Sequence, residues 1–255
     1  MPLLSIVTPC FQAARWLPAA LDSVAALRVP HEHVVVDGGS RDGTVELLSK
    51  REDSALRWIS EADRGQTHAV NKGLTLARGD LLMWVNADDE IVPEGVARAV
   101  EHLERHPDTQ VVYGGLDFMD ANGSVRRPYR PAPWSFRRYL FLGDYVPTPT
   151  IIFRRSRYLA VGTLDERWED AADYDFYLRL MHGVRVDQLP DAHVRFRYHH
   201  ASKTGRDAFK AQSEALEIRL RWARNLTDRA IMRGFDGFKR AVLPTLTAGR
   251  WPAPF

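Results

Sequence analysis

The 255-residue sequence contains a single cysteine, Cys10. It has no apolar run near the roughly 20 residues that cross a bilayer. One cysteine excludes an internal disulfide and favours a reducing compartment. The N-terminus lacks the cationic, apolar and small-residue regions of a signal peptide. We therefore expect a cytoplasmic protein, long enough to bury a sizeable core as one large domain or as a domain with an appendage.

Charge is distributed unevenly along the chain, although the net charge is only +2. Residues 206–255 carry ten lysines and arginines against five acids, a net +5, which leaves −3 for residues 1–205. Apolar side chains alternate with arginines in this tail, as in an amphipathic helix on an anionic membrane. A helix packed on the domain, or a dimer contact, explains the same pattern. The tail has no recognised nucleic-acid-binding module, so we expect no nucleic-acid partner.

The first 115 residues alternate short apolar strands with helical patterns. The expected strands are Leu3–Thr8, His33–Val36, Leu56–Ser60, Leu81–Val85 and Val111–Tyr113. The expected helices are Trp16–Leu27, Thr44–Lys50, Gln66–Ala77 and Glu94–His106. Such alternation predicts an α/β fold, with a Rossmann-like, mostly parallel central sheet and helices on both faces.

The pattern becomes less regular after residue 115. Asp120–Gly123 is a hairpin turn signal, and Arg126–Trp134, with three prolines, is expected to be irregular. The later elements are expected to be strands at Thr150–Phe153, Val184–Leu189 and Val194–Tyr198, and helices at Tyr174–Met181 and Asp207–Leu226. We treat residues 1–205 as one domain, with halves 1–115 and 116–205, and residues 206–255 as a helical appendage.

The apolar strand Leu81–Val85 ends abruptly in Asn86-Ala87-Asp88-Asp89. Carboxylates beside a buried strand are costly unless they bind something. In open α/β sheets, ligands bind at the carboxyl ends of the strands. Hard oxygen ligands there suit Mg²⁺ or Mn²⁺ carrying a diphosphate. The alternative interpretation is a strand end followed by an acidic helix cap.

Two further segments follow the expected strands. Asp37-Gly38-Gly39-Ser40 could place a carboxylate on a pyrimidine N–H or a ribose hydroxyl, although a plain turn with Asp42 or Thr44 as helix cap fits as well. Asp63-Arg64-Gly65 precedes a helix whose N-terminus favours an anion, with Arg64 and Lys72 adding positive charge. Solvated surface charges are the alternative there. The spacing of a dinucleotide-binding fingerprint is absent.

Taken together, these segments resemble glycosyltransferase family 2, the inverting GT-A class. The resemblance covers roughly residues 3–205 and rests on the order and spacing of Ser5–Phe11, Asp37–Ser40, Asp42–Thr44, Ser60–Gly65, Asn71–Gly73, Ala77–Asp80 and Asn86–Asp89. It implies a metal-dependent transferase that moves a sugar from a nucleotide-sugar, a UDP-sugar first, to a hydroxyl of a glycan or lipid-linked acceptor. A role in cell-envelope polysaccharide synthesis follows from the same resemblance.

The resemblance also implies roles for single residues. Asp88 would bind the Mn²⁺ or Mg²⁺ on the donor diphosphate, and His199, or else His200, would complete the metal shell. The donor-binding positions are Pro9, Phe11, Asp37, Asp63, Gly65, Asn71, Asn86, Ala87, Asp88 and Asp89. Asn86 departs from the aspartate of the family motif. Lys203 and Arg206 would neutralise the phosphates of the leaving group.

Asp173 matches the family's catalytic base, which takes the proton of the acceptor hydroxyl. Ala172 stands where the family has glutamate, and Asp173 as a simple helix cap is the alternative. Asp175, and then Asp170, are the fallback bases. Aromatic side chains in the segment Trp134–Tyr145 would form a lid that stacks on sugars, or a packed helix.

Two other functions share parts of this pattern. A nucleotidyltransferase that makes nucleotide-sugars has a similar sheet, but residues 9–16 lack its glycine-rich basic loop. A non-catalytic binder of nucleotide-sugars or glycans is the second alternative, and the presence of both Asp88 and Asp173 argues against it.

Overall fold

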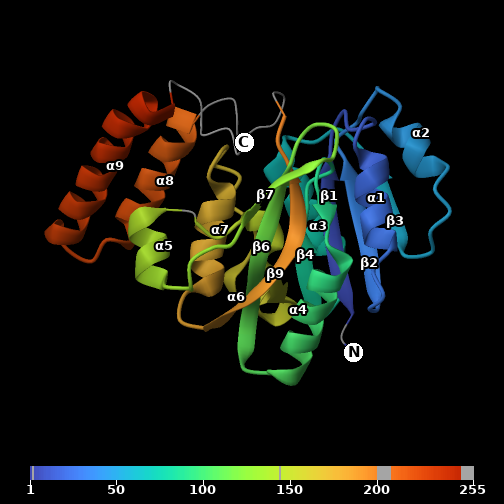
Figure 1. Ribbon diagram of the computed structural model, residues 1–255, viewed down its shortest axis with the longest axis horizontal. Helices are drawn as coiled ribbons and strands as arrows, with labels where there is room; N and C mark the ends of the chain where they lie inside the picture. The colour runs from blue at the N-terminus through green and yellow to red at the C-terminus, as the bar shows by residue number, and fades with distance from the viewer. Residues whose placement is uncertain (2, 144, 200–207, 248–255) are drawn as a thin grey trace.

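The computed structural model describes residues 1, 3–143, 145–199 and 208–247, with the backbone alone for residues 142, 208–209 and 239–247. Within these residues, nine strands form one sheet in the order β3-β2-β1-β4-β8-β6-β9-β5, with β7 paired to β6 (Figure 1). The strands are β1 Leu4–Cys10, β2 His31–Asp37, β3 Leu56–Ser60, β4 Leu81–Trp84, β5 Glu90–Ile91, β6 Thr109–Met119, β7 Val125–Tyr129, β8 Ile152–Arg154 and β9 Arg185–Arg197.

The first half of the sheet is parallel and the second half is mixed. Strand β1 pairs in parallel with β2 and β4, and β2 pairs in parallel with β3. Beyond β4 the short strand β8 runs antiparallel to both β4 and β6, while β6 and β9 are parallel. The carboxyl ends of β1, β2 and β4 therefore meet at one edge, which the parallel half presents to a ligand.

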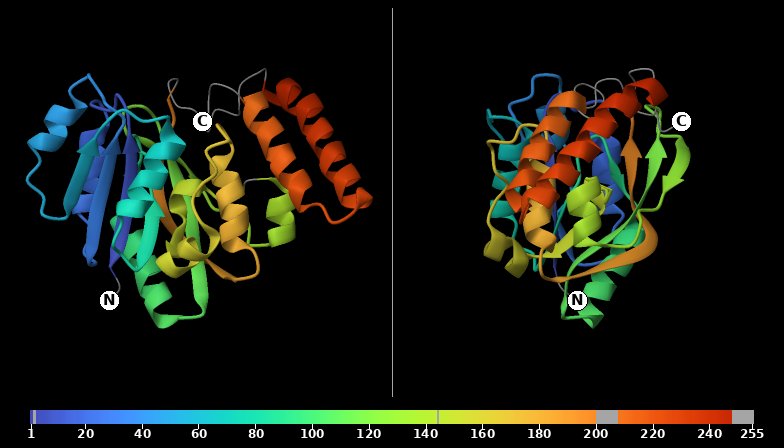
Figure 2. Two further views of the ribbon diagram at one scale, coloured as in Figure 1. Left: turned by 180° about the vertical axis from the view of Figure 1, so that it is seen from behind. Right: turned by 90° about the vertical axis from the view of Figure 1, so that its left-hand side faces the viewer.

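Helices cover both faces of the sheet, as predicted (Figure 2). They are α1 Leu17–Ala25, α2 Thr44–Ser49, α3 Gln66–Leu76, α4 Pro93–Arg105, α5 Phe136–Leu142, α6 Arg155–Val161, α7 Ala172–Met181, α8 Ala208–Trp222 and α9 Leu226–Thr247. Alternate strand residues divide the core between the faces. Val7 packs with α3 and α7, whereas Ile6 packs with α1 and α4.

Close packing of α3 on β1 depends on a glycine. A Cβ atom at Gly73 would lie 2.3 Å from Cγ1 of Val7, well inside van der Waals contact. The absence of a side chain lets the helix approach the strand and brings its N-terminus to the edge where β1 ends.

The last two helices, α8 and α9, form a hairpin beside α5 and α7 (Figure 1). Asn225 begins α9, because its side-chain oxygen accepts the backbone N–H of Asp228 at 2.8 Å. None of the described helices combines the length and the apolar character that a bilayer crossing demands.

Several expected boundaries were wrong. The two strands expected at Val184–Leu189 and Val194–Tyr198 form one strand, β9, and the helix expected at Asp207–Leu226 ends at Trp222. Part of the segment expected to be irregular forms β7, which follows the predicted turn at Asp120–Gly123 and pairs with β6. Most strands and helices of the first half lie within a few residues of their predicted bounds, but β6 continues past Tyr113 to Met119, and β5 was not predicted.

Candidate active site

Loops that follow β1 and β2 are tied together at the carboxyl edge of the sheet. The backbone N–H of Gln12 donates to Oγ of Ser40 at 2.8 Å, and the N–H of Ala13 donates to Oγ1 of Thr44 at 3.0 Å. Asp42 accepts the N–H of Ala14 at 3.0 Å and also bonds Thr44 at the start of α2. Asp42 and Thr44 therefore brace the loop as well as beginning the helix.

Asp37, the last residue of β2, is fully buried. Its Oδ2 accepts the backbone N–H groups of Gly39 and Ser40 and the hydroxyl of Ser60, at 3.0, 2.9 and 2.6 Å. Burial alone would raise the pKa of Asp37, but the hydrogen bonds from Ser40 and Ser60 outweigh it and lower the pKa below its usual value. Asp37 thus stays ionised and holds the turn that follows β2.

Pro9 and Phe11 lie on the other side of this turn. Pro9 is buried in β1 opposite Val36, whereas Phe11, just after the strand, is 63% exposed. An exposed aromatic ring at the ligand edge of a sheet offers a stacking surface for a planar base.

The segment before α3 lies directly on the turn after β2. A Cβ atom at Gly38 would lie 2.6 Å from Oδ2 of Asp63, so a larger residue there would displace that carboxylate. The other oxygen of Asp63 accepts the N–H of Gly65 at 2.8 Å. Gly65 has φ of 111°, a left-handed conformation that glycine adopts readily, and it starts α3.

Polar residues after β4 bond to the elements around them. Oδ1 of Asn86 accepts a hydrogen bond from Gln66, the first residue of α3, at 2.7 Å. Asp89 is 1% exposed and accepts the N–H of Arg197 at 2.9 Å. Burial, together with the charge of Asp88, raises the pKa of Asp89 well above its ordinary value. Ala87 is buried among apolar residues of β1 and α1.

Asp88 has a different environment from Asp89. Its carboxylate is part-exposed, and Oδ2 lies 2.9 Å from Nε2 of His199, which follows β9. The indole of Trp16 stacks on the imidazole with a centroid separation of 4.1 Å. The guanidinium of Arg197 donates to the main-chain oxygen of Asp88 at 2.9 Å and pairs with Glu90. Strand β9 therefore places His199 beside Asp88, a residue that lies 111 positions earlier in the chain.

A carboxylate oxygen and an imidazole nitrogen at this edge suit Mn²⁺, and the oxygen suits Mg²⁺. No group of three or more metal-binding side chains was found among the described residues. A cation held by Asp88 and His199 would therefore draw further ligands from the donor diphosphate and from water. His200, Lys203 and Arg206 lie outside the described residues.

Asp173 lies in the first turn of α7. Its Oδ2 accepts the hydroxyl of Thr148 at 3.0 Å. One turn further along the helix, Tyr177 stacks on Trp84, the last residue of β4, with centroids 5.8 Å apart. Asp173 and Tyr177 are four residues apart and share a helix face, so this ring contact holds the first turn of α7 close to the end of β4.

The two fallback bases are used differently. Asp175 forms an ion pair with Arg179, with oxygen and nitrogen 2.9 Å apart. Asp170 precedes the helix, and its backbone N–H donates to Glu214 of α8. Thr148 lies in a short turn that contacts β4, and its hydroxyl bonds the carboxylate of Asp173. This bond places Asp173, of the three aspartates, beside the end of β4.

Comparison with known proteins identifies the family. Residues 5–160 match the model described as Glycosyl transferase family 2. The chain belongs to glycosyltransferase family 2. The matched range includes Asp37 and Asp88, whereas Asp173 and His199 follow it.

Two curated relatives of this glycosyltransferase come from mycobacteria. It is 35% identical over 182 residues to an uncharacterized glycosyltransferase of Mycobacterium tuberculosis, with 70% of this chain and 68% of the relative covered. It is 30% identical over 184 residues to a PGL/p-HBAD biosynthesis glycosyltransferase of Mycobacterium bovis, with 70% of this chain and 69% of the relative covered.

Two solved structures share its fold. S. aureus TarS 1-349 in complex with UDP-GlcNAc superposes with a TM-score of 0.70 at 18% identity, covering 95% of this chain and 74% of that one. The mannosyltransferase PcManGT from Pyrobaculum calidifontis, in complex with GDP-Man and Mn²⁺, gives a TM-score of 0.66 at 21% identity, covering 97% and 74%. The predicted α/β, GT-A fold is confirmed.

A contact that the sequence analysis missed holds the start of α7 in the glycosyltransferase. The carboxylate of Glu214, in α8, accepts the backbone N–H groups of Glu169, Asp170 and Ala171 at 3.2, 2.8 and 2.9 Å. Lys210, one turn earlier, pairs with Glu169. Within the first turn of α7 the carboxylate of Asp173 accepts the backbone N–H of Tyr174 at 2.8 Å, and Glu214 adds a second negative charge at this N-terminus.

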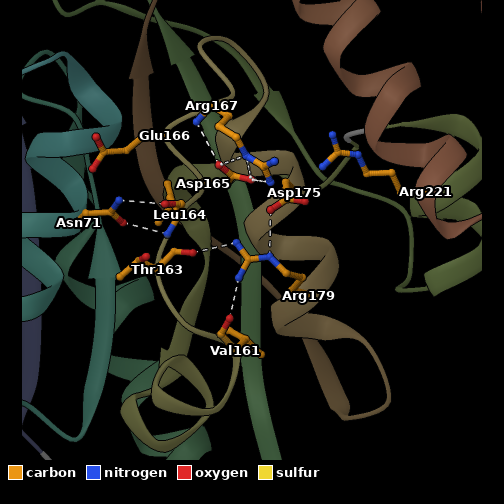
Figure 3. A pocket seen from close by; sticks show the side chains of 10 residues that line it. All are labelled: Asn71, Val161, Thr163, Leu164, Asp165, Glu166, Arg167, Asp175, Arg179 and Arg221. Carbon is orange, nitrogen blue, oxygen red and sulfur yellow. Dashed lines mark hydrogen bonds and ion pairs between the residues drawn. The ribbon is translucent and has the colours of Figure 1, made fainter.

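Asn71 of α3 holds the chain segment before α7 (Figure 3). Its amide nitrogen donates to the carbonyl of Leu164 and its oxygen accepts the N–H of the same residue, both at 2.9 Å. Leu164 lines a hollow of about 740 Å³ between α3 and α7, together with Arg179 and Arg221. Donor contact by Asn71 stays a prediction, and the observed contact fixes the chain between α6 and α7.

The predicted lid contains a packed helix. Tyr139 of α5 is fully buried, with its ring 5.4 Å from Trp134, 5.8 Å from Tyr145 and 5.2 Å from Tyr174. The hydroxyl of Tyr174 donates to the carbonyl of Tyr139 at 2.9 Å. These aromatic side chains join α5 to α7, which favours the packed-helix alternative for this segment.

Proposed function

We propose that this glycosyltransferase moves a sugar, with inversion, from a nucleotide-sugar to a hydroxyl group of a glycan or lipid-linked acceptor. Its proposed cofactor is Mn²⁺ or Mg²⁺, bound through Asp88 and His199. The observation that carries the proposal is the 2.9 Å contact between those two side chains at the carboxyl edge of the parallel strands.

The names of the similar proteins support the choice of donor and acceptor. TarS was solved with UDP-GlcNAc and PcManGT with GDP-Man and Mn²⁺, and one curated relative is named for PGL/p-HBAD biosynthesis. We therefore propose a UDP-sugar as the first donor to test, with a GDP-sugar second, and an acceptor that belongs to the cell envelope.

The donor would bind across the ends of β1, β2 and β4. Pro9, Phe11 and Asp37 would contact the nucleoside, and Asp63 and Gly65 would line the same side, where the N-terminus of α3 favours a phosphate. Asn86 and Asp89 would hold the loop that presents Asp88. A bound divalent cation would neutralise charge on the departing nucleoside diphosphate. Residues 116–205 would shape the acceptor side.

In the proposed reaction, Asp173 accepts the proton of the acceptor hydroxyl as that oxygen attacks the anomeric carbon. The bond between the anomeric carbon and the phosphate oxygen breaks, and its electron pair leaves with the diphosphate. Attack from the face opposite the diphosphate inverts the anomeric configuration. The hydrogen bond from Thr148 orients the Asp173 carboxylate for this step.

Slow hydrolysis of the donor tests the stereochemistry before the acceptor is known. Proton NMR of the sugar released in the first minutes identifies its anomer before mutarotation. For an α-linked donor we expect the β-sugar with Mn²⁺, and no release with EDTA. Release of the α-sugar would contradict inversion, and an equal rate in EDTA would contradict the metal requirement.

A further inference from the structure

The outer face of α9 carries unusually exposed apolar side chains. Leu226, Ile231 and Phe238 are 82%, 51% and 62% exposed. At 100° per residue they fall within a sector of roughly 140°, which also contains the exposed residues Thr227, Ala230, Gly234 and Gly237. Opposite this sector Met232 is buried against the domain, so α9 has one apolar face inside and a second apolar face outside.

Cationic residues border the exposed apolar sector. Arg229 and Arg233 are exposed along one side of it, and Arg224 is exposed in the turn before α9. Of the two acids in this stretch, Asp236 is buried and Asp228 is part-exposed. Asp236 bonds Arg219 at 3.2 Å, and Asp228 accepts the N–H of Arg224 at 3.0 Å. Among residues 224–238, no exposed acidic side chain offsets these arginines.

We propose that this face of α9, defined by Leu226, Ile231 and Phe238 with Arg224, Arg229 and Arg233, binds the surface of an anionic lipid bilayer. The apolar sector would enter the boundary between headgroups and acyl chains, and the arginines would contact anionic headgroups. The helix lies along the outer side of the molecule, where its length can rest on a plane (Figure 1). A second copy of this face would oppose arginine with arginine, which disfavours self-association.

Full-length protein is sedimented with vesicles of phosphatidylcholine alone, and with vesicles containing 30 mol% phosphatidylglycerol. We expect binding to the anionic vesicles, weakened by salt, and little to the neutral ones. I231S/F238S should abolish it. R229A/R233A should weaken it about fivefold for each arginine removed.

Leu159→Ser removes a side chain that is 68% exposed on α6, and it is the matched control for loss of an exposed apolar residue. The control should bind as the unaltered protein does. Equal binding to both vesicles, no binding to either, or equal loss in the control would overturn the proposal. A dimer that I231S/F238S dissociates, without vesicle binding, would assign the face to a second copy instead. The assay contains no donor, so its outcome is independent of the proposed reaction.

Discussion

At the residue scale, polar side chains at the ligand edge fall into two groups. Asp37 and Asp89 are buried and bonded to backbone N–H groups, so they hold loops in place. Asp88 and Asp173 are instead part-exposed, with carboxylates that bond His199 and Thr148. This difference is the basis for assigning chemistry to Asp88 and Asp173.

Asp88→Asn tests the metal assignment. The amide keeps the shape of the side chain but is a poorer ligand for a hard cation, so we expect kcat/KM to fall about 100-fold or more, several kcal/mol of transition-state stabilisation. Calorimetric titration of UDP with and without Mn²⁺ should show that the metal no longer strengthens binding. Asp108→Asn, an exposed acid before β6, is the control. Metal-strengthened binding that survives in Asp88→Asn would contradict the assignment.

Asp173→Asn tests the base. Loss of a general base lowers the rate by a factor of about 10²–10⁴, and the donor site on the other strands should be unaffected. We expect donor binding to persist while transfer is lost. Asp175→Asn is the informative comparison, because Asp175 already pairs with Arg179. If Asp175→Asn loses transfer while Asp173→Asn retains it, the role of catalytic base belongs to Asp175 and not to Asp173.

Sequence identified the chemistry of these residues, and the family resemblance grouped Asp88 with His199, but the bond from Thr148 to Asp173 was not foreseen. The order of the motifs placed Asp37 and Asp88 at strand ends, because an apolar run that stops at an acid is visible in one dimension. The contact of Asp88 with His199 joins residues 111 positions apart, and it depends on β9 running beside β6. Nothing local marks Asn71 as the partner of Leu164 either, since its contact is to backbone.

At the element scale, the start of α7 depends on α8. Three backbone N–H groups just before α7 donate hydrogen bonds to the carboxylate of Glu214, and Asp173 follows within one helical turn. The C-terminal hairpin therefore contributes to the position of the proposed base, although it lies outside the range of the family match.

Glu214→Gln should disturb this arrangement without removing a reacting group. Hydrogen bonds to a charged group contribute about 1.5–3 kcal/mol, so we expect a lower melting temperature by several degrees. We also expect kcat to fall about tenfold at unchanged donor KM, since a small displacement of a reacting group is costly. Glu217→Gln, on the exposed side of the same helix, should change neither. Reduced stability with an unchanged kcat would limit Glu214 to a structural role.

Boundaries of the later elements were harder to predict than their existence. Two strands were expected at Val184–Leu189 and Val194–Tyr198, yet β9 continues through Pro190, where its register with β6 shifts between Tyr113 and Gly115. A long helix was expected through Leu226, but the side chain of Asn225 caps a new helix there. An Asn three residues before Asp228 was a recognisable start signal that the apolar spacing concealed.

At the scale of the whole molecule, two buried histidines link stability to pH. Burial lowers the pKa of His33 to about 3 and that of His193 to about 4, against about 6.5 in an unfolded chain. Both are neutral in the folded protein at pH 5, where the unfolded chain binds protons. The contribution of the two histidines to the free energy of unfolding is complete above about pH 6.5 and is lost as the pH falls toward 4.

Urea unfolding between pH 7.5 and 5 measures this dependence. Each histidine should remove up to about 1.4 kcal/mol of stability per pH unit below its unfolded pKa. Asp89 opposes them, because burial raises its pKa in the folded state. Comparison of the unaltered protein with His193→Gln isolates one histidine, and the variant should show a flatter profile. Parallel profiles would mean that His193 is not neutral when folded.

The proposed function of the whole molecule requires nucleotide-sugar binding at the ends of β1, β2 and β4, with a divalent cation held at Asp88. Its most direct test is calorimetric binding of a panel of UDP-, GDP- and dTDP-sugars, each with Mn²⁺ and with EDTA. We predict that one nucleotide class binds with Mn²⁺ and binds much more weakly in EDTA. If no nucleotide-sugar binds under either condition, or if EDTA makes no difference, the assignment of this edge as a metal-dependent donor site is wrong.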